Sequence, residues 1–136
     1  MAGTRRSQGD PLAVQEIVNR GLARYEQHDY ARAIQHFTTA IALAPYEPDA
    51  YFHRGNAHRY AGDLDAAIAD YGAAIRRDPS FAMAYYNRAM ARKLNSDIAG
   101  AIADLEQYLE VCAGLCPEDR TEVEQSVRDL RRILRR

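Results

Sequence analysis

The chain has 136 residues, a length typical of one domain, and its 47% hydrophobic and 27% charged residues are those of a folded globular protein. Its net charge of −1 excludes the global basic field that holds nucleic acid or an anionic membrane surface. There is no run of about 18 apolar residues and no secretory signal, so we expect no membrane-spanning helix and predict a cytoplasmic protein.

The start of the chain predicts a tail followed by a helix. Residues 1–9 have no hydrophobic periodicity and are predicted to form a disordered tail. Asp10-Pro11 then combines a good N-cap residue with proline at the first helical position. The first helix is therefore expected to begin near residue 11.

The central part of the chain repeats itself at an offset of 34 residues. Identical residue types recur in the three segments 17–45, 51–79 and 85–113: Arg20, Arg54 and Arg88; Asp29, Asp63 and Asp97; Ala33, Ala67 and Ala101; Ile34, Ile68 and Ile102. A fixed period of this length indicates stacked supersecondary units. Each unit reads as two helices, and the repeated Asp is a suitable N-cap for the second. The predicted helices are 11–27, 30–43, 48–61, 64–77, 82–95 and 98–114, with no strand.

A seventh helix is predicted at 118–134. Its apolar residues fall on one helical stripe: Val123, Val127, Leu130 and Leu134. Acidic residues lead and arginines trail, which suits the helix dipole. Because a repeat array exposes an apolar end surface, we expect this helix to act as a solubilising cap on the third repeat.

Small and aromatic residues at set spacings carry a resemblance to a known family. In the second unit they are Tyr51, Gly55, Ala67, Tyr71, Ala74 and Pro79. On these residues the chain resembles the tetratricopeptide repeat family over residues 14–115. The first repeat departs from the pattern at Arg24, and the third at Leu105, Tyr108 and Ala113. The resemblance implies an all-α fold: a right-handed superhelical solenoid of three helix-turn-helix repeats (about 14–47, 48–81 and 82–115) with a capping helix, within a single domain at 10–136.

The recurring arginine predicts buried ion pairs. Arg stands where the family more often has an apolar residue, and Asp70 and Asp104 recur at one spacing on the second helices of their repeats. A buried guanidinium group needs a carboxylate or carbonyl partner. We therefore expect Arg54 and Arg88 to be largely buried and one of them to contact Asp70. Pairing within one repeat and pairing between repeats both remain open.

Catalysis has little support in the sequence. There is no phosphate loop, no nucleophile elbow and no paired carboxylate in a recognisable context, so we expect no catalytic residues and no enzyme. Cys112 and Cys116 provide half a zinc site at most, and we expect them to pack as small apolar residues under the last helix, with a redox or metal role as the alternative. No metal or other cofactor is predicted.

The surface with the most functional information is the outer face of the first helix of each repeat. At 100° per residue, three strips lie away from the core. We call them the groove strips: Gln15, Val18, Asn19, Leu22, Tyr25 and Glu26; Asp49, Phe52, His53, Asn56, Arg59 and Tyr60; Met83, Tyr86, Asn87, Met90, Lys93 and Leu94. The resemblance places these strips side by side in a concave groove. The predicted ligand-binding residues are Asn19, Phe52, His53, Asn56, Arg59, Tyr60, Tyr86, Asn87, Met90 and Lys93.

The chemistry of the strips predicts a peptide ligand. Side-chain amides bind both the N–H and the C=O of an extended backbone, while Tyr, Phe and Met supply contact area. Glu26 and Asp49 balance Arg59 and Lys93, so we expect a ligand that is largely uncharged at its contact centre. In the alternative interpretation, the extra apolar side chains pack against neighbouring repeats or under the C-terminal helix.

One sub-type of the family does not fit. Members that clamp the acidic C-termini of heat-shock chaperones share a set of cations and asparagines, whose matching positions here are Val18, Leu22, His53, Met83 and Asn87. No cation stands at any of them, so we do not expect a chaperone-tail clamp.

The function predicted from the sequence is a non-catalytic module that binds a protein or peptide partner in the groove. Two alternatives remain: a self-assembling scaffold that oligomerises through its repeats or its C-terminal helix, and a regulatory subunit that docks on an enzyme. We expect a monomer or a weak homo-oligomer, and neither nucleic acid nor membrane as a partner.

Overall fold

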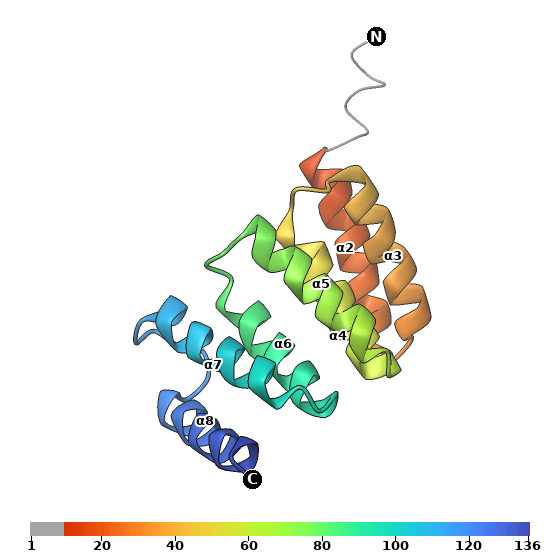
Figure 1. Ribbon diagram of the computed structural model, residues 1–136. Helices are drawn as coiled ribbons and strands as arrows, with labels where there is room; N and C mark the ends of the chain where they lie inside the picture. Colours follow the sequence, from red (N-terminus) through yellow and green to blue (C-terminus); the bar gives the residue numbers. More distant parts are fainter. Residues whose placement is uncertain (1–9) are drawn as a thin grey trace.

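A computed structural model describes residues 10–136, which form seven helices and no strand (Figure 1). The helices are α2 (Pro11–Glu26), α3 (Tyr30–Leu43), α4 (Pro48–Ala61), α5 (Leu64–Arg77), α6 (Ala82–Leu94), α7 (Ile98–Cys112) and α8 (Arg120–Leu134). Each begins and ends within about two residues of its predicted bounds, so the all-α prediction is confirmed. The tail predicted at residues 1–9 lies outside the described residues.

Aspartate side chains set the start of most helices. Asp29, Asp63 and Asp97, which recur at the 34-residue period, each accept a hydrogen bond from the backbone N–H three residues later. Asp119 caps α8 in the same way, and Asp10 caps α2 by accepting from the backbone N–H two residues later. These bonds satisfy N–H groups that have no partner inside the helix, which is why a local sequence signal located the helix boundaries well.

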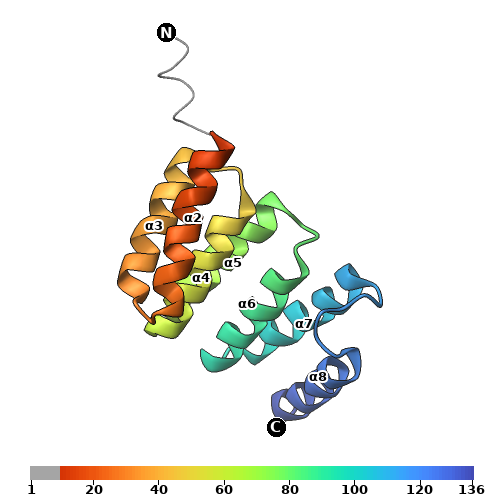
Figure 2. The same ribbon diagram turned by 180° about the vertical axis from the view of Figure 1, so that it is seen from behind.

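The helices follow one another along the molecule in chain order, from α2 and α3 at one end to α8 at the other (Figures 1 and 2). Each helix packs against its neighbours in the chain, and α4 also touches α2 and α6. The first helices of the three repeats are thus adjacent, which brings the three groove strips together. Within residues 10–136, no helix is long and apolar enough to cross a membrane.

Glycines in the first two repeats allow the paired helices to approach closely. A Cβ atom at Gly55 would lie 2.8 Å from Cε1 of Tyr71, and one at Gly21 would lie 2.5 Å from Cε1 of Phe37. Both rings are fully buried. The small residue on the first helix therefore makes room for the aromatic residue on the second, which explains why the two recur together.

Two buried ion pairs tie the helices of repeats two and three. The residues Asp70 and Asp104 are only 6% and 3% exposed. Arg54 donates to both oxygens of Asp70 at 2.8 Å, and Arg88 donates to both oxygens of Asp104 at 2.9 and 2.7 Å. The predicted contact between Arg54 and Asp70 is confirmed, and pairing occurs within one repeat. Arg20, the matching residue of repeat one, is exposed.

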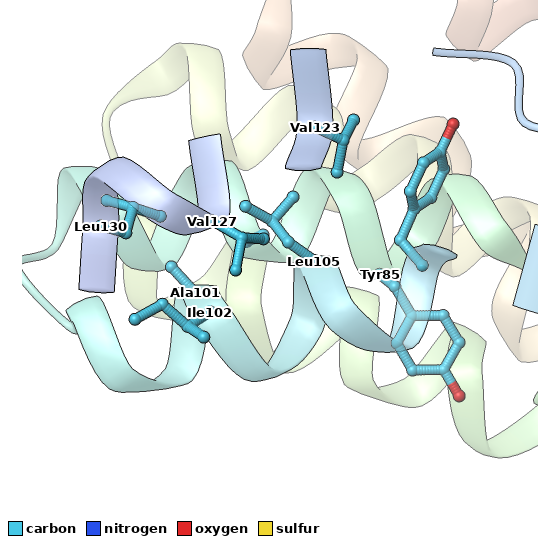
Figure 3. Packing of buried hydrophobic residues seen from close by; sticks show 9 residues of the cluster. Tyr85, Ala101, Ile102, Leu105, Val123, Val127 and Leu130 are labelled. Carbon is cyan, nitrogen blue, oxygen red and sulfur yellow. The ribbon is translucent and has the colours of Figure 1, made fainter. Parts of the chain in front are cut away.

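Helix α8 packs its apolar stripe on α7. Val123, Val127 and Leu130 are at most 6% exposed and point toward Ala101 and Leu105 (Figure 3). The fourth residue of the predicted stripe, Leu134, is 56% exposed, because it lies at the end of the helix. The seventh helix thus covers the apolar side of the third repeat, as predicted.

Candidate functional site

An amide pair joins α4 and α6 in the middle of the groove strips. Nδ2 of Asn87 donates to Oδ1 of Asn56 at 3.0 Å, and the buried hydroxyl of Tyr71 on α5 donates to the same oxygen. Both lone pairs of Oδ1 are therefore used, which fixes the orientation of both amides. Nδ2 of Asn56 and Oδ1 of Asn87 have no hydrogen-bond partner among the described residues, which leaves one donor and one acceptor side by side.

Phe52 and His53 are held between repeats. The Phe52 ring lies 4.7 Å from that of Phe81 and 5.9 Å from that of Tyr71, measured between centroids. The His53 ring lies 5.6 Å from the buried ring of Phe37. Phe52 also packs against clusters that include Ala84 and Ala91 of α6. The contacts of His53 with repeat one and of Phe52 with α6 are the packing between neighbouring repeats that the alternative interpretation describes, and both rings are only partly accessible.

Burial lowers the pKa of His53 below its usual 6.5, although the negative charge of Asp49 acts in the opposite direction. As the pH falls below 6.5, the unfolded chain takes up a proton at this position that the folded chain does not. The free energy of unfolding should therefore decrease as the pH falls below 6.5 and level off once the pH is below the folded-state pKa.

Urea unfolding at a series of pH values below neutrality checks this expectation. His53→Gln should remove part of the decrease, because glutamine does not titrate. His28→Asn is the matched control: His28 is exposed, and its positive φ of 60° is one that asparagine tolerates. If the His53→Gln protein shows the same pH dependence as the unaltered protein, histidine burial is not its cause.

Tyr86 and Met90 lie at the end of the groove that α8 covers. Both pack against the cluster of buried residues formed by α6, α7 and α8, and the Tyr86 ring lies 5.4 Å from that of Tyr108. Burial raises the pKa of Tyr86, and the negative charge of Glu118 raises it further. Much of the surface of Tyr86 and Met90 is thus covered by packing under the C-terminal helix, which is the second part of the alternative interpretation.

Three tyrosines gather where the first helices of repeats one and two end, and we call them the tyrosine cluster: Tyr25, Tyr30 and Tyr60. Their ring centroids lie 5.6–6.1 Å apart, and Tyr60 is 55% exposed. The guanidinium carbon of Arg59 lies 5.2 Å from the centroid of the Tyr60 ring. Arg59 and Tyr60 thus lie together at the end of α4, beside the tyrosine cluster.

The remaining predicted residues, Asn19 and Lys93, are exposed. Asn19 is exposed on α2, accepts a hydrogen bond from Gln15 at 2.9 Å, and lines a shallow hollow with Leu22 and Glu26. Lys93 is exposed near the end of α6. The structure therefore joins Asn56 to Asn87 and places Arg59 and Tyr60 beside the tyrosine cluster, whereas Asn19 and Lys93 belong to neither group.

Sequence reasoning missed the contribution of the second helices. Tyr30 on α3 completes the tyrosine cluster, and Tyr71 on α5 orients the Asn56 amide. It also missed a cavity of about 190 Å³ between α2, α3 and the start of α4. Its lining residues are Pro11, Val14, Gln15, Val18, Ala40, Ala44, Glu47, Asp49 and Ala50. The helical stripe of a single helix contains no signal for such contacts.

The two cysteines require a correction. They pack against the buried cluster of the third repeat, as predicted, but Cys112 and Cys116 are also joined by a disulfide. Helix α7 ends at Cys112, and Ala113 takes a left-handed conformation with φ 47°, so the chain turns back and brings the sulfur atoms together. Within the described part of the chain, no group of three or more His, Cys, Asp or Glu residues is arranged to hold a metal ion.

Comparison with known proteins gives one family and several similar folds. A family model described as a TPR repeat matches residues 21–59 and 55–96, which together are more than half of the chain. No curated protein matches the sequence.

Among solved structures, the first TPR of Spaghetti (RPAP3) bound to the HSP90 peptide SRMEEVD matches with a TM-score of 0.81 at 24% identity, over 96% of each chain. The Sgt2 TPR domain from Aspergillus fumigatus has a TM-score of 0.80 at 22% identity, over 90% of this chain and 79% of that one. The Yersinia enterocolitica type III secretion translocator chaperone SycD has a TM-score of 0.83 at 18% identity, over 91% and 87%.

Proposed function

Because the chain belongs to the tetratricopeptide repeat family, we propose that it is a non-catalytic protein-interaction module that binds a partner segment along the groove strips of α2, α4 and α6. The similarity in fold to a domain solved with a bound peptide supports this proposal. The positions that match the cations and asparagines of a chaperone-tail clamp here are Val18, Leu22, His53, Met83 and Asn87, and none of them is a cation, so the partner differs from such a tail.

The observation that carries the proposal is the amide pair Asn56–Asn87. A peptide unit presents one C=O and one N–H, and the pair presents one uncommitted donor and one uncommitted acceptor in a fixed orientation. Since Tyr71 holds the Asn56 amide from behind, little side-chain entropy is lost when a peptide binds. This pre-organisation favours an extended segment that is recognised through its backbone.

Selection of random dodecapeptides by phage display on the full chain tests the proposal. Peptides that bind should lose affinity by about 1–3 kcal/mol on Asn56→Ala or Asn87→Ala, measured by calorimetry, because each change removes one backbone contact. Asn95→Ala is the matched control, since Asn95 lies beyond α6 and donates to Asp65. Melting temperatures of the variants establish that they are folded at the temperature of the binding measurement.

Two results would contradict the proposal that the partner binds along the groove strips. One is that no peptide is selected. The other is that peptides bind both variants as well as the unaltered chain but are lost when Arg131, Arg132, Arg135 and Arg136 are neutralised, which would move the site to α8.

A further inference from the structure

Arg59 differs from every other half-buried arginine among residues 10–136. Five such arginines have a carboxylate or backbone carbonyl partner: Arg24, Arg54, Arg77, Arg88 and Arg92. Within this part of the chain Arg59 has no carboxylate within 4.0 Å, and its side-chain hydrogen bond is to the neutral hydroxyl of Tyr71. A partly desolvated guanidinium group whose charge no carboxylate compensates is costly to the protein, so an anionic partner outside the chain would bind with a corresponding gain.

The surroundings of Arg59 hold it in place and leave its nitrogens accessible. Its guanidinium carbon lies 5.2 Å from the centroid of the Tyr60 ring, within the range of a cation–π contact. Among the described residues, no fully buried side-chain nitrogen lacks a partner, so the unpaired nitrogens of Arg59 reach solvent. A guanidinium group that stacks on a ring and faces solvent is oriented to bind a planar anion with two parallel hydrogen bonds.

Hydroxyl groups from three helices lie within electrostatic reach of Arg59. Burial raises the pKa values of Tyr25 on α2, Tyr71 on α5 and Tyr86 on α6, and the positive charge of Arg59 opposes that rise in each case. The hydroxyl hydrogen of Tyr71 is used by Asn56, but the neutral phenols of Tyr25 and Tyr86 can donate to an anion without neutralising the cation. The single charge of Arg59 matches a carboxylate better than a phosphate group, whose charge of about −2 calls for further cations.

We propose that Arg59 binds the side-chain carboxylate of an aspartate or glutamate within the partner segment. This inference rests on the proposed function and adds one charged anchor to a ligand whose other contacts are uncharged. Because α4 touches α2 and α6, the bound segment has contact surface on both sides of Arg59. An acidic side chain in the interior of the segment fits this central position, whereas a C-terminal carboxylate would leave one side of the groove empty.

The test is dodecapeptide selection on the full chain and on two variants. Peptides selected on the unaltered chain should be enriched in Asp or Glu at one interior position. Arg59→Gln should weaken their binding by about 10- to 100-fold, the range for a hydrogen bond to a charged group. Arg59→Glu should instead select peptides with Lys or Arg at that position. Arg76→Gln is the matched control, because Arg76 is exposed on α5. Far-UV circular dichroism should be the same for all four proteins.

The results separate this inference from the proposed function. Peptides that depend on Asn56 but show no acidic preference, or bind Arg59→Gln unchanged, overturn the carboxylate anchor and leave the groove in place. A second outcome is that the peptides show no interior acidic preference and lose their affinity when their C-terminus is amidated. Arg59 would then bind a terminal carboxylate, and the proposal of an interior acidic anchor would be wrong. If no peptide is selected on the unaltered chain, the groove and the anchor are both wrong.

Discussion

Removal of the residues after Pro117 is expected to turn the protein into an aggregating or oligomeric species. The truncation deletes α8 and with it Val123, Val127 and Leu130, all nearly fully buried. Burial of a large aliphatic side chain contributes about 1.5–3 kcal/mol, so the loss is about 5 kcal/mol or more. This is a large share of the roughly 5–15 kcal/mol that stabilises a typical domain.

The newly exposed surface explains why association should accompany the loss of stability. Leu105 and Tyr108 are fully buried in the intact chain, and truncation would expose them on α7. An open end of a repeat array is apolar and self-complementary to other such ends. Light scattering and thermal unfolding of the truncated and intact chains measure both effects.

Single substitutions in the full-length chain distinguish the loss of packing between α8 and α7 from the effect of a shorter chain. Val127→Asp in the full-length chain should reproduce the oligomers, because an unpaired carboxylate cannot be buried against Leu105. Arg128→Ala, one residue further along on the exposed face, should leave the protein monomeric. A truncated chain that stays monomeric with an unchanged melting temperature would show that α8 serves a partner rather than the fold.

Asp104→Ala and Asp70→Ala are each expected to lower the free energy of unfolding by about 3–5 kcal/mol. Each leaves a partly buried guanidinium group without its carboxylate, and the side chains of Arg54 and Arg88 are only 22% and 19% exposed. The effect should be larger at Asp104, because this carboxylate also accepts from Arg92 at 2.9 Å. Urea unfolding provides the measurement.

Two controls distinguish an orphaned charge from general damage. The double variant Arg88→Met with Asp104→Leu should recover much of the loss, since an apolar pair of similar volume removes the unpaired charge. Asp129→Ala breaks the exposed pair with Arg132 and should cost less than about 1 kcal/mol. A loss at Asp104 as small as that at Asp129 would mean that the buried pair contributes no more than a surface one.

The sequence by itself determined the helices, their order and the direction in which each strip points. These features depend on short-range interactions: the caps at Asp29, Asp63 and Asp97 bond to N–H groups three residues away, and the apolar stripe has the period of the helix. The 34-residue repeat then implied that each unit packs on the next. The same reasoning predicted a carboxylate partner for Arg54 but not which repeat would supply it.

Only the tertiary structure decided which strip residues remain available to a ligand. Phe52 and Tyr86 point toward the groove by helical position, yet Phe81, just before α6, and Tyr108 on α7 lie against their rings. Arg59 has the same kind of position, and no carboxylate of the described residues lies within 4.0 Å of it. Whether a side chain is covered or open depends on groups that are distant in sequence, and the angle of a residue on its own helix contains no information about what lies in front of it.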